Sequence, residues 1–317
     1  MTRPSAQYGS FALLAGVILI WGTGYWPTEV AGEHTETVLL SGLRVIGGAL
    51  LLVSAALLAR SRWPRGRMLG WAAISGLIMV ALSHWGTTEA VTRAGPGNAA
   101  VLVNAAPLIV AAVGWFVLRE RLSWIGITGV IVGFGGVVLM VSSQLGGNAD
   151  TRQLLIGVGL GVAAAVGWAI GTLLVRAFAT RRGEEMDMLS FTATQFTVAG
   201  AVLLVAGFGI DGVATTEWRS TELWAVLFWI GPISGLGFAF YFVALGRMTA
   251  ARASAALFLV PGVAVIVEIV RGNVPTALVL IGMFLAVAGV ALVNVPRGAL
   301  ARVAPRVWRR LRGATTS

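Results

Sequence analysis

The sequence contains no cysteine and no lysine among its 317 residues. Without cysteine, the chain can form no disulfide, no thiolate metal site and no cysteine nucleophile. Without lysine, it has no phosphate-binding loop of the form GxxxxGK(S/T), which excludes ATP-driven work by this chain alone. The two histidines, His34 and His84, are too few for a metal cluster. We therefore expect no metal, no cofactor and no enzymatic activity.

Charge is also scarce, since 11% of the residues are charged and 57% are hydrophobic. The mean hydropathy of +0.86 is too high for a soluble domain, which must keep a large polar share on its surface. The sequence therefore predicts an all-α membrane protein. Ten apolar runs are long enough to cross a hydrocarbon core of about 30 Å. They are 9–30, 36–59, 67–92, 96–118, 123–142, 153–179, 186–208, 222–245, 250–270 and 275–295.

All 23 basic residues are arginines, and their distribution predicts the orientation of the chain. With the N-terminus inside, 18 arginines fall on the inner side and four on the outer side. Basic residues are enriched in cytoplasmic loops, so ten crossings with both termini cytoplasmic are predicted, in a bacterial inner (plasma) membrane. The arginines do not gather on a soluble domain, so nucleic acid is not an expected partner. The basic tail, residues 297–317, is predicted to lie on the anionic inner leaflet.

The two halves of the sequence resemble each other at a nearly constant offset. The alignment pairs Trp21 with Trp168 and Pro107 with Pro261, residue types that rarely coincide by chance. It also pairs Gly129 with Gly282 and Gly136 with Gly289. The matching blocks are GVILIWGTGYW (16–26) with AAAVGWAIGTL (163–173), AVTRAGPGNAAVLVNAAP (90–107) with ALGRMTAARASAALFLVP (244–261), and SWIGITGVIVGFGGVVL (123–139) with TALVLIGMFLAVAGVAL (276–292).

This duplication predicts two five-helix repeats, residues 1–146 and 147–296. Five is an odd number of crossings, so the second repeat must be inverted relative to the first. Inverted repeats are typical of secondary transporters, which bind their substrate near the midplane at the interface between the repeats.

The segment LIWGTGYW, the prolines predicted in the fourth and ninth helices and the stretch RERLSWIGITGVIVGFGGVVLM resemble the drug/metabolite transporter superfamily. The match is to its ten-helix EamA-type carriers and covers nearly the whole chain. Gly272 and Asn273 depart from it, because an acidic residue often stands there in the family. The resemblance implies a small-molecule carrier. Within the superfamily, the aromatic residues of this chain suggest a resemblance to the bacterial amino-acid exporters.

Aromatic and polar residues within the apolar runs are the candidates for substrate binding. Trp21 and Tyr25 share one face of the first helix, and Trp168 and Thr172 repeat this pattern in the sixth. Both tryptophans lie roughly 20 Å deep, too far for an interface belt, so they are expected to face each other across the repeats. Ordinary helix packing is the alternative. The remaining candidates are His84, Trp85, Asn104 and Tyr241.

His84 can donate to a substrate carboxylate or shuttle a proton, or it can be a packed histidine bonded to a neighbouring helix. Asn104 can bond a substrate or hold helices together. Arg44 is expected to snorkel to the outer headgroups. Glu89 and Glu268, with His84, are candidates for proton coupling, although solvated charges at the helix ends are the commoner explanation for such acids.

Pro107, Pro261 and Gly235 are candidate hinges of a gate. Each proline removes a backbone hydrogen bond in mid-span, and both are expected on helices that line the pathway. A static kink is the alternative.

Residues 9–28 contain no acid, which disfavours a proton-coupled cation antiporter that depends on a glutamate in its first helix. The missing lysines disfavour a phosphate carrier. We expect an exporter of aromatic or other hydrophobic and neutral amino acids that works by alternating access, as a monomer, with a dimer as the alternative. Efflux of drugs, purines or other small metabolites is the alternative function.

Overall fold

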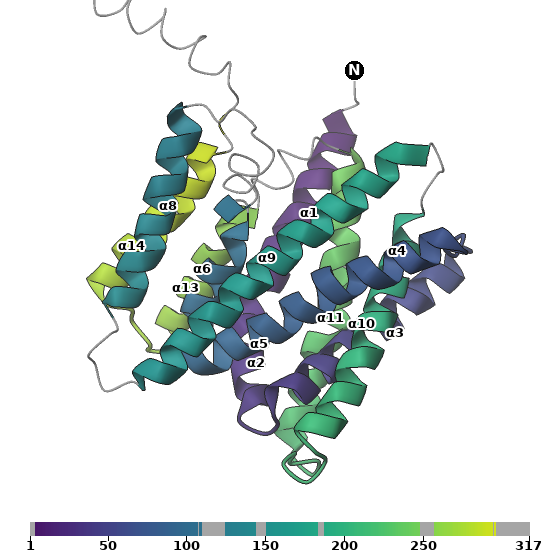
Figure 1. The fold of residues 1–317 in the computed structure, drawn as a ribbon, viewed down its shortest axis with the longest axis horizontal. Helices are drawn as coiled ribbons and strands as arrows, with labels where there is room; N and C mark the ends of the chain where they lie inside the picture. The colour runs from purple at the N-terminus through teal and green to yellow at the C-terminus, as the bar shows by residue number, and fades with distance from the viewer. Residues whose placement is uncertain are drawn as a thin grey trace, which may run out of the picture.

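The computed structural model describes residues 4–106, 108–109, 124–143, 150–182, 187–247, 257–293 and 295, and all the regular structure in them is helical. Figure 1 shows the helices in a single bundle. In chain order they are α1 (Pro4–Thr23), α2 (Tyr25–Gly32), α3 (Thr37–Leu58), α4 (Arg67–Gly76), the π-helix η1 (Leu77–Ala81), α5 (Leu82–Ala94), α6 (Pro96–Asn104), α8 (Trp124–Ser142), α9 (Thr151–Arg182), α10 (Met188–Ile210), α11 (Thr221–Arg247), the 3₁₀-helix η2 (Leu257–Leu259), α13 (Val260–Val270) and α14 (Ala277–Val293).

Six of the described helical segments are long and apolar enough to cross a membrane, among them the continuous segment Arg67–Ala94. Val260–Val270 and Ala277–Val293 are shorter apolar helices. Large hydrophobic side chains cover the outside of the bundle, with Leu50, Phe228 and Phe284 at 65%, 83% and 71% exposure. Such a surface suits lipid rather than water. The chain is therefore a multi-pass membrane protein, and helical residues lie within every predicted span.

Close helix pairs build the bundle, chiefly α3 with α10, α8 with α14, α5 with α9 and α1 with α11. Glycines allow the backbones of α8 and α14 to touch, because a Cβ added at Gly129 would lie 2.7 Å from the carbonyl oxygen of Gly289. A Cβ at Gly136 would likewise lie 2.5 Å from the carbonyl oxygen of Gly282. These are two instances of one contact, since the sequence alignment exchanges Gly129 with Gly282 and Gly136 with Gly289. Figure 1 shows α8 and α14 side by side at one edge of the bundle.

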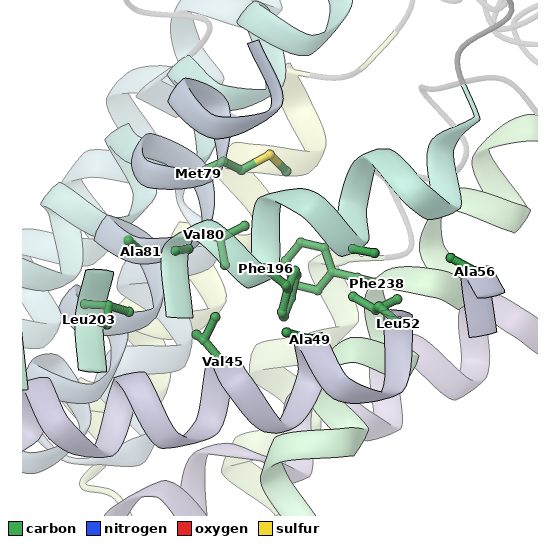
Figure 2. Packing of buried hydrophobic residues seen from close by; sticks show 12 residues of the cluster. Val45, Ala49, Leu52, Ala56, Met79, Val80, Ala81, Phe196, Leu203 and Phe238 are labelled. Carbon is green, nitrogen blue, oxygen red and sulfur yellow. The ribbon is translucent and has the colours of Figure 1, made fainter. Parts of the chain in front are cut away.

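The main hydrophobic core lies where α3, η1, α10 and α11 meet. Val45, Ala49 and Leu52 form one buried face of α3, and Phe196 of α10 and Phe238 of α11 fill the space against it. Figure 2 shows both rings between the helices, close to Ala49 and Leu52. The small residues of α3 admit these rings, because a Cβ at Gly48 would come within 2.9 Å of the Phe196 ring.

Among the described residues, the first and third predicted spans are not continuous α-helices, and neither are the fourth, where α6 ends at Asn104, and the ninth, where η2 precedes α13. The first breaks at Gly24 into α1 and α2, and the third contains the π-helix η1 one turn before His84. Local π-helices shift the side chains that follow them and are frequent at functional sites. Neither the break at Gly24 nor the π-helix was predicted from the sequence.

Candidate functional site

Six rings from five helices meet in the middle of the bundle, and we call them the aromatic cluster. Trp21 and Trp168 contact each other edge to face, with ring centroids 5.6 Å apart and planes at 82°. Phe238 lies 5.4 Å from both tryptophans and therefore links them to the rest of the cluster. The full set is Trp21 of α1, His84 of α5, Trp168 of α9, Phe196 of α10, and Phe238 and Tyr241 of α11.

The sequence brings these rings together through small residues on the facing helices. Gly237 precedes Phe238 in α11, and a Cβ added there would collide with the indole of Trp21. Trp21 and Trp168 are half-buried, whereas Phe196 and Phe238 are almost fully buried. The cluster therefore has a packed base and two tryptophans that keep part of their surface accessible. Edge-to-face ring contacts of this kind are each worth about 0.5–1.5 kcal/mol beyond their burial.

His84 packs within the cluster and bonds to its own helix. Its ring stacks on Phe238 at 6.0 Å and meets Phe196 edge-on at 5.6 Å. Nδ1 lies 2.9 Å from the carbonyl oxygen of Val80, which can only accept, so Nδ1 carries a proton. A neutral ring then offers only an acceptor, at Nε2. The expected donation from His84 to a substrate carboxylate would require the protonated ring.

The remaining substrate candidates lie around the cluster. Asn104 donates from Nδ2 to the hydroxyl of Tyr25 at 3.2 Å, so α6 and α2 are joined by a polar contact. Tyr25 follows Trp21 by one turn, and Trp21 packs against the apolar group around Tyr25. Thr172 donates to the carbonyl of Trp168 in its own helix. Trp85 donates to Glu89, one turn further along α5.

Arg44 does not snorkel, and the sequence-based expectation for it is wrong. Its Nε donates to the hydroxyl of Ser234 at 2.9 Å and its Nη1 to the hydroxyl of Thr28 at 3.1 Å. Thr28 and Ser234 are both buried between helices, so the guanidinium points into the bundle. Two hydroxyl acceptors on α2 and α11, far from Arg44 in the sequence, hold it there.

The acids considered for proton coupling belong to polar networks at the predicted outer ends of the helices. Glu89 pairs with Arg93 and accepts from Thr37 and Trp85, while Arg93 also bonds to Gln153 of α9. Glu89 is therefore bound by three donors and is not a free rim charge.

A second network surrounds Arg271, which follows α13. Its Nη1 donates to Glu268 at 2.9 Å and to Glu29 of α2 at 2.7 Å. Asn273 donates to the other oxygen of Glu268. Glu268, like Glu89, is therefore held by side-chain donors, in this case Arg271 and Asn273.

A third network joins the loop before α3 to the loop before α11. His34 lies 2.7 Å from a carboxylate oxygen of Glu217, and the hydroxyls of Thr35 and Thr216 are 2.7 Å apart. The pKa of His34 is raised, and the hydrogen bond with Glu217 is the largest cause. Burial lowers the pKa of His34, and Glu222 raises it further. All three networks connect residues on opposite sides of the predicted boundary between the repeats.

Two of the three gate candidates, Pro261 and Gly235, lie in the described residues, and neither forms a mid-helix kink. Pro261 stands in the first turn of α13, directly after η2, where a missing N–H costs nothing. It lines a cavity of about 10 Å³ together with Asn104. Gly235 lies where α11 touches α3, since a Cβ added to Gly235 would lie 2.6 Å from the carbonyl oxygen of Gly48. Pro107 lies outside the described residues.

Sequence reasoning missed Phe196 and Phe238, which form the base of the aromatic cluster. Hydrophobic periodicity does not mark the inward face of either helix, because α11 is apolar almost throughout and the inward face of α10 also carries polar residues such as Gln195. The spacing of Phe238 and Tyr241, one turn apart and next to Gly237, was a usable signal.

The described residues form a helical bundle with an apolar outer surface and a ring cluster at its centre, which defines a polytopic membrane protein. The EamA-like transporter family model matches residues 8–142 and again residues 155–295. The chain therefore belongs to the EamA-like transporter family of the drug/metabolite transporter superfamily, whose members carry small molecules across membranes.

Several named relatives resemble the chain over most of its length. YvbV of Bacillus subtilis, an uncharacterized transporter, is 26% identical over 89% of this chain and 90% of its own. The "Probable terminal-alkyne amino-acid exporter" of Streptantibioticus cattleyicolor is 29% identical over 87% of this chain and 90% of its own. The "Probable amino-acid metabolite efflux pump" of Salmonella typhimurium is 25% identical over 90% of this chain and 94% of its own. A crystal structure with 22% identity has the same fold, with a TM-score of 0.62 over 92% of this chain and 96% of that one.

Proposed function

We propose that this protein exports amino acids with aromatic or other hydrophobic side chains across the bacterial inner membrane. The observation that carries the proposal is the contact of Trp21 with Trp168 at the centre of the aromatic cluster. Indole faces offer a large apolar surface at a depth where few polar groups can compete. The names of the two relatives described as amino-acid exporter or efflux pump point to the same substrate class.

The proposed topology is ten crossings in two inverted five-helix repeats, residues 1–146 and 147–296, with both termini and the tail 297–317 cytoplasmic. The family model supports a repeat, because it matches the chain twice. The reciprocal glycine contacts between α8 and α14 support a two-fold relation between the halves. The arginine distribution supports the orientation.

The transport cycle follows from the placement of the two tryptophans in different repeats. The rings touch in this conformation, so a substrate side chain can enter only if Trp21 and Trp168 separate. The three polar networks join the repeats at their predicted outer ends, and we take this conformation to be closed to the outside. Export then requires these networks to open while the inner side closes, which is alternating access.

Flux measurements with purified protein in liposomes test the proposal. Labelled phenylalanine is loaded on one side, and unlabelled tryptophan, phenylalanine, methionine and threonine are offered as competitors. We expect flux well above that of empty liposomes, with the strongest competition from the aromatic amino acids. Flux of none of these amino acids would contradict the proposal and favour the alternative of drug, purine or metabolite efflux, which the same liposomes can test.

A further inference from the structure

Arg44 is a charged side chain inside the bundle that no described acid neutralises. It is half-buried in α3, about two turns from the start of that helix. Ion pairs in the described part of the chain involve Arg93, Arg271 and His34, and none involves Arg44. A guanidinium in the interior of a membrane protein is costly without a counter-charge, and such residues commonly mark substrate pathways.

The two hydroxyls that hold Arg44 act only as acceptors toward it. Thr28 already donates its hydroxyl proton to the carbonyl of Gly24 at 2.7 Å, and Ser234 donates to the carbonyl of Ile230 at 2.6 Å. Their remaining lone pairs fix Nε and Nη1 of Arg44 and so set the orientation of the guanidinium plane. These two bonds use a minority of its five N–H donors and leave its charge uncompensated.

One side of the guanidinium faces a buried glycine. A Cβ added at Gly24 would lie 4.0 Å from Nη2 of Arg44, and glycine at this position leaves that space without a side chain. Nη2 has no hydrogen-bond partner among the described residues. The break between α1 and α2 also falls at Gly24, so the free donors face an irregular point of the first span.

Three helices place Arg44 one turn from the aromatic cluster, on the side of the predicted outer surface. Ser234 precedes Phe238 by one turn of α11, and Thr28 follows Tyr25, which lies next to the cluster in the apolar group that Trp21 packs against, by one turn of α2. Gly48 follows Arg44 by one turn of α3 and packs against the ring of Phe196. The guanidinium therefore lies about 5 Å further along the helix axes than the rings.

We propose that Arg44 binds the carboxylate of a substrate whose apolar side chain lies among the rings of the aromatic cluster. The fixed guanidinium presents parallel donors that match a carboxylate, and the bound substrate supplies the missing negative charge. This inference rests on the proposed function and refines it, because it selects substrates with a free carboxylate over neutral or cationic analogues of the same shape.

Binding of phenylalanine and of phenylalaninamide, which lacks the carboxylate, tests the inference. The intrinsic tryptophan fluorescence of purified protein reports both dissociation constants, and their ratio measures selectivity for the carboxylate. We expect wild-type protein to bind phenylalanine at least about tenfold more tightly, a difference of about 1.4 kcal/mol. Arg44→Gln should bring the ratio close to one, and Arg44→Lys should give an intermediate ratio.

The matched control is Arg65→Gln, which removes an exposed arginine from the loop before α4 and should leave the ratio unchanged. Should Arg44→Gln fail to fold, Thr28→Val and Ser234→Ala remove one orienting acceptor each and should lower the ratio in part. Equal binding of the two ligands by wild-type protein, or an equal loss of both in Arg44→Gln, would overturn the inference and leave amino-acid export standing. Absence of any amino-acid binding or flux in wild-type protein would instead contradict the proposed function.

Discussion

Trp21 and Trp168 lie 147 positions apart in the sequence and meet edge to face at 5.6 Å. They are also the residues that the repeat alignment pairs with each other, so the predicted repeats would give them equivalent positions in the two halves. A contact between equivalent residues is expected on the axis that relates two repeats. Any motion of one half against the other must therefore alter this contact.

Replacing Trp168 by alanine should weaken binding of aromatic substrates by about tenfold, since it removes a ring surface and one ring–ring contact. Trp168→Phe keeps part of the ring surface and should cost less. Isothermal titration or fluorescence binding with tryptophan measures both. Trp124→Ala is the control, because Trp124 is 83% exposed on α8. Unchanged affinity in Trp168→Ala would remove the cluster from the substrate site.

The sequence predicted the parts of this site that repeat. Trp21 and Trp168 were recognised as a pair because tryptophan is rare enough for its alignment to carry information. Glycine is abundant and carries less information, but its aligned positions in α8 and α14 lie where these helices touch, with Gly129 against Gly289 and Gly136 against Gly282. The ten predicted runs each contain helix, whereas the number of crossings and their orientation stay predictions.

The features of the site that were not predicted from the sequence depend on contacts between segments that are distant in the chain. Arg44 was expected at the headgroups because no nearby residue in the sequence reveals the hydroxyls of Thr28 and Ser234 that turn it inward. Pro261 was expected in mid-helix because an uninterrupted apolar run gives no sign of the 3₁₀ turn before it. Phe238 was overlooked because α11 is apolar on every side. In a membrane protein, hydrophobicity locates helices but does not orient them.

The seam between α8 and α14 can be tested with adjacent glycines of α8. A Cβ at Gly136 would lie 2.5 Å from backbone atoms of α14, whereas a Cβ at Gly135 meets nothing within 4 Å. Gly136→Ala should therefore destabilise the protein by about 1–3 kcal/mol, as overpacking does. Gly135→Ala should be neutral or slightly stabilising, because alanine is the better helix former. Thermal unfolding in detergent measures both, and equal stability of the two variants would show that the helices separate readily.

Glu89 is expected to support the outer network rather than to exchange a proton during transport. Protonation of Glu89 would remove the counter-charge of Arg93. It would also leave one of the three groups that donate to Glu89 without an acceptor. Glu89→Gln should therefore lower the free energy of unfolding by roughly 1–3 kcal/mol, because Arg93 is partly exposed. It should also leave the response of phenylalanine flux to an imposed pH gradient unchanged.

The control for this variant is Glu36→Gln, which removes an exposed acid without an ion pair in the described structure and should alter neither quantity. Loss of the pH-gradient response in Glu89→Gln, with flux retained in the absence of a gradient, would identify Glu89 as a coupling residue. The response of flux to a pH gradient in Glu268→Gln then shows whether Glu268, rather than Glu89, is the coupling residue.

The loop contact of His34 with Glu217 should make stability depend on pH. The pKa of His34 is raised in the folded protein, chiefly by the Glu217 hydrogen bond, which outweighs the opposing effect of burial. A raised pKa stabilises the folded state fully below the unfolded value of about 6.5, and this contribution is lost as the pH rises through the folded pKa. The contribution should stay below about 1 kcal/mol, because Glu217 is largely exposed and screened by solvent.

Thermal unfolding measured between about pH 5.5 and 8.5 checks this sign. Wild-type protein should lose stability as the pH rises above about 6.5, and His34→Gln should flatten that part of the profile. Glu33→Gln changes the neighbouring exposed acid and should keep the wild-type profile. A His34→Gln profile that still falls over this range would assign the dependence to another group. If the profile flattens and phenylalanine flux also loses its dependence on external pH, the loop contact belongs to the outer closure that export must open.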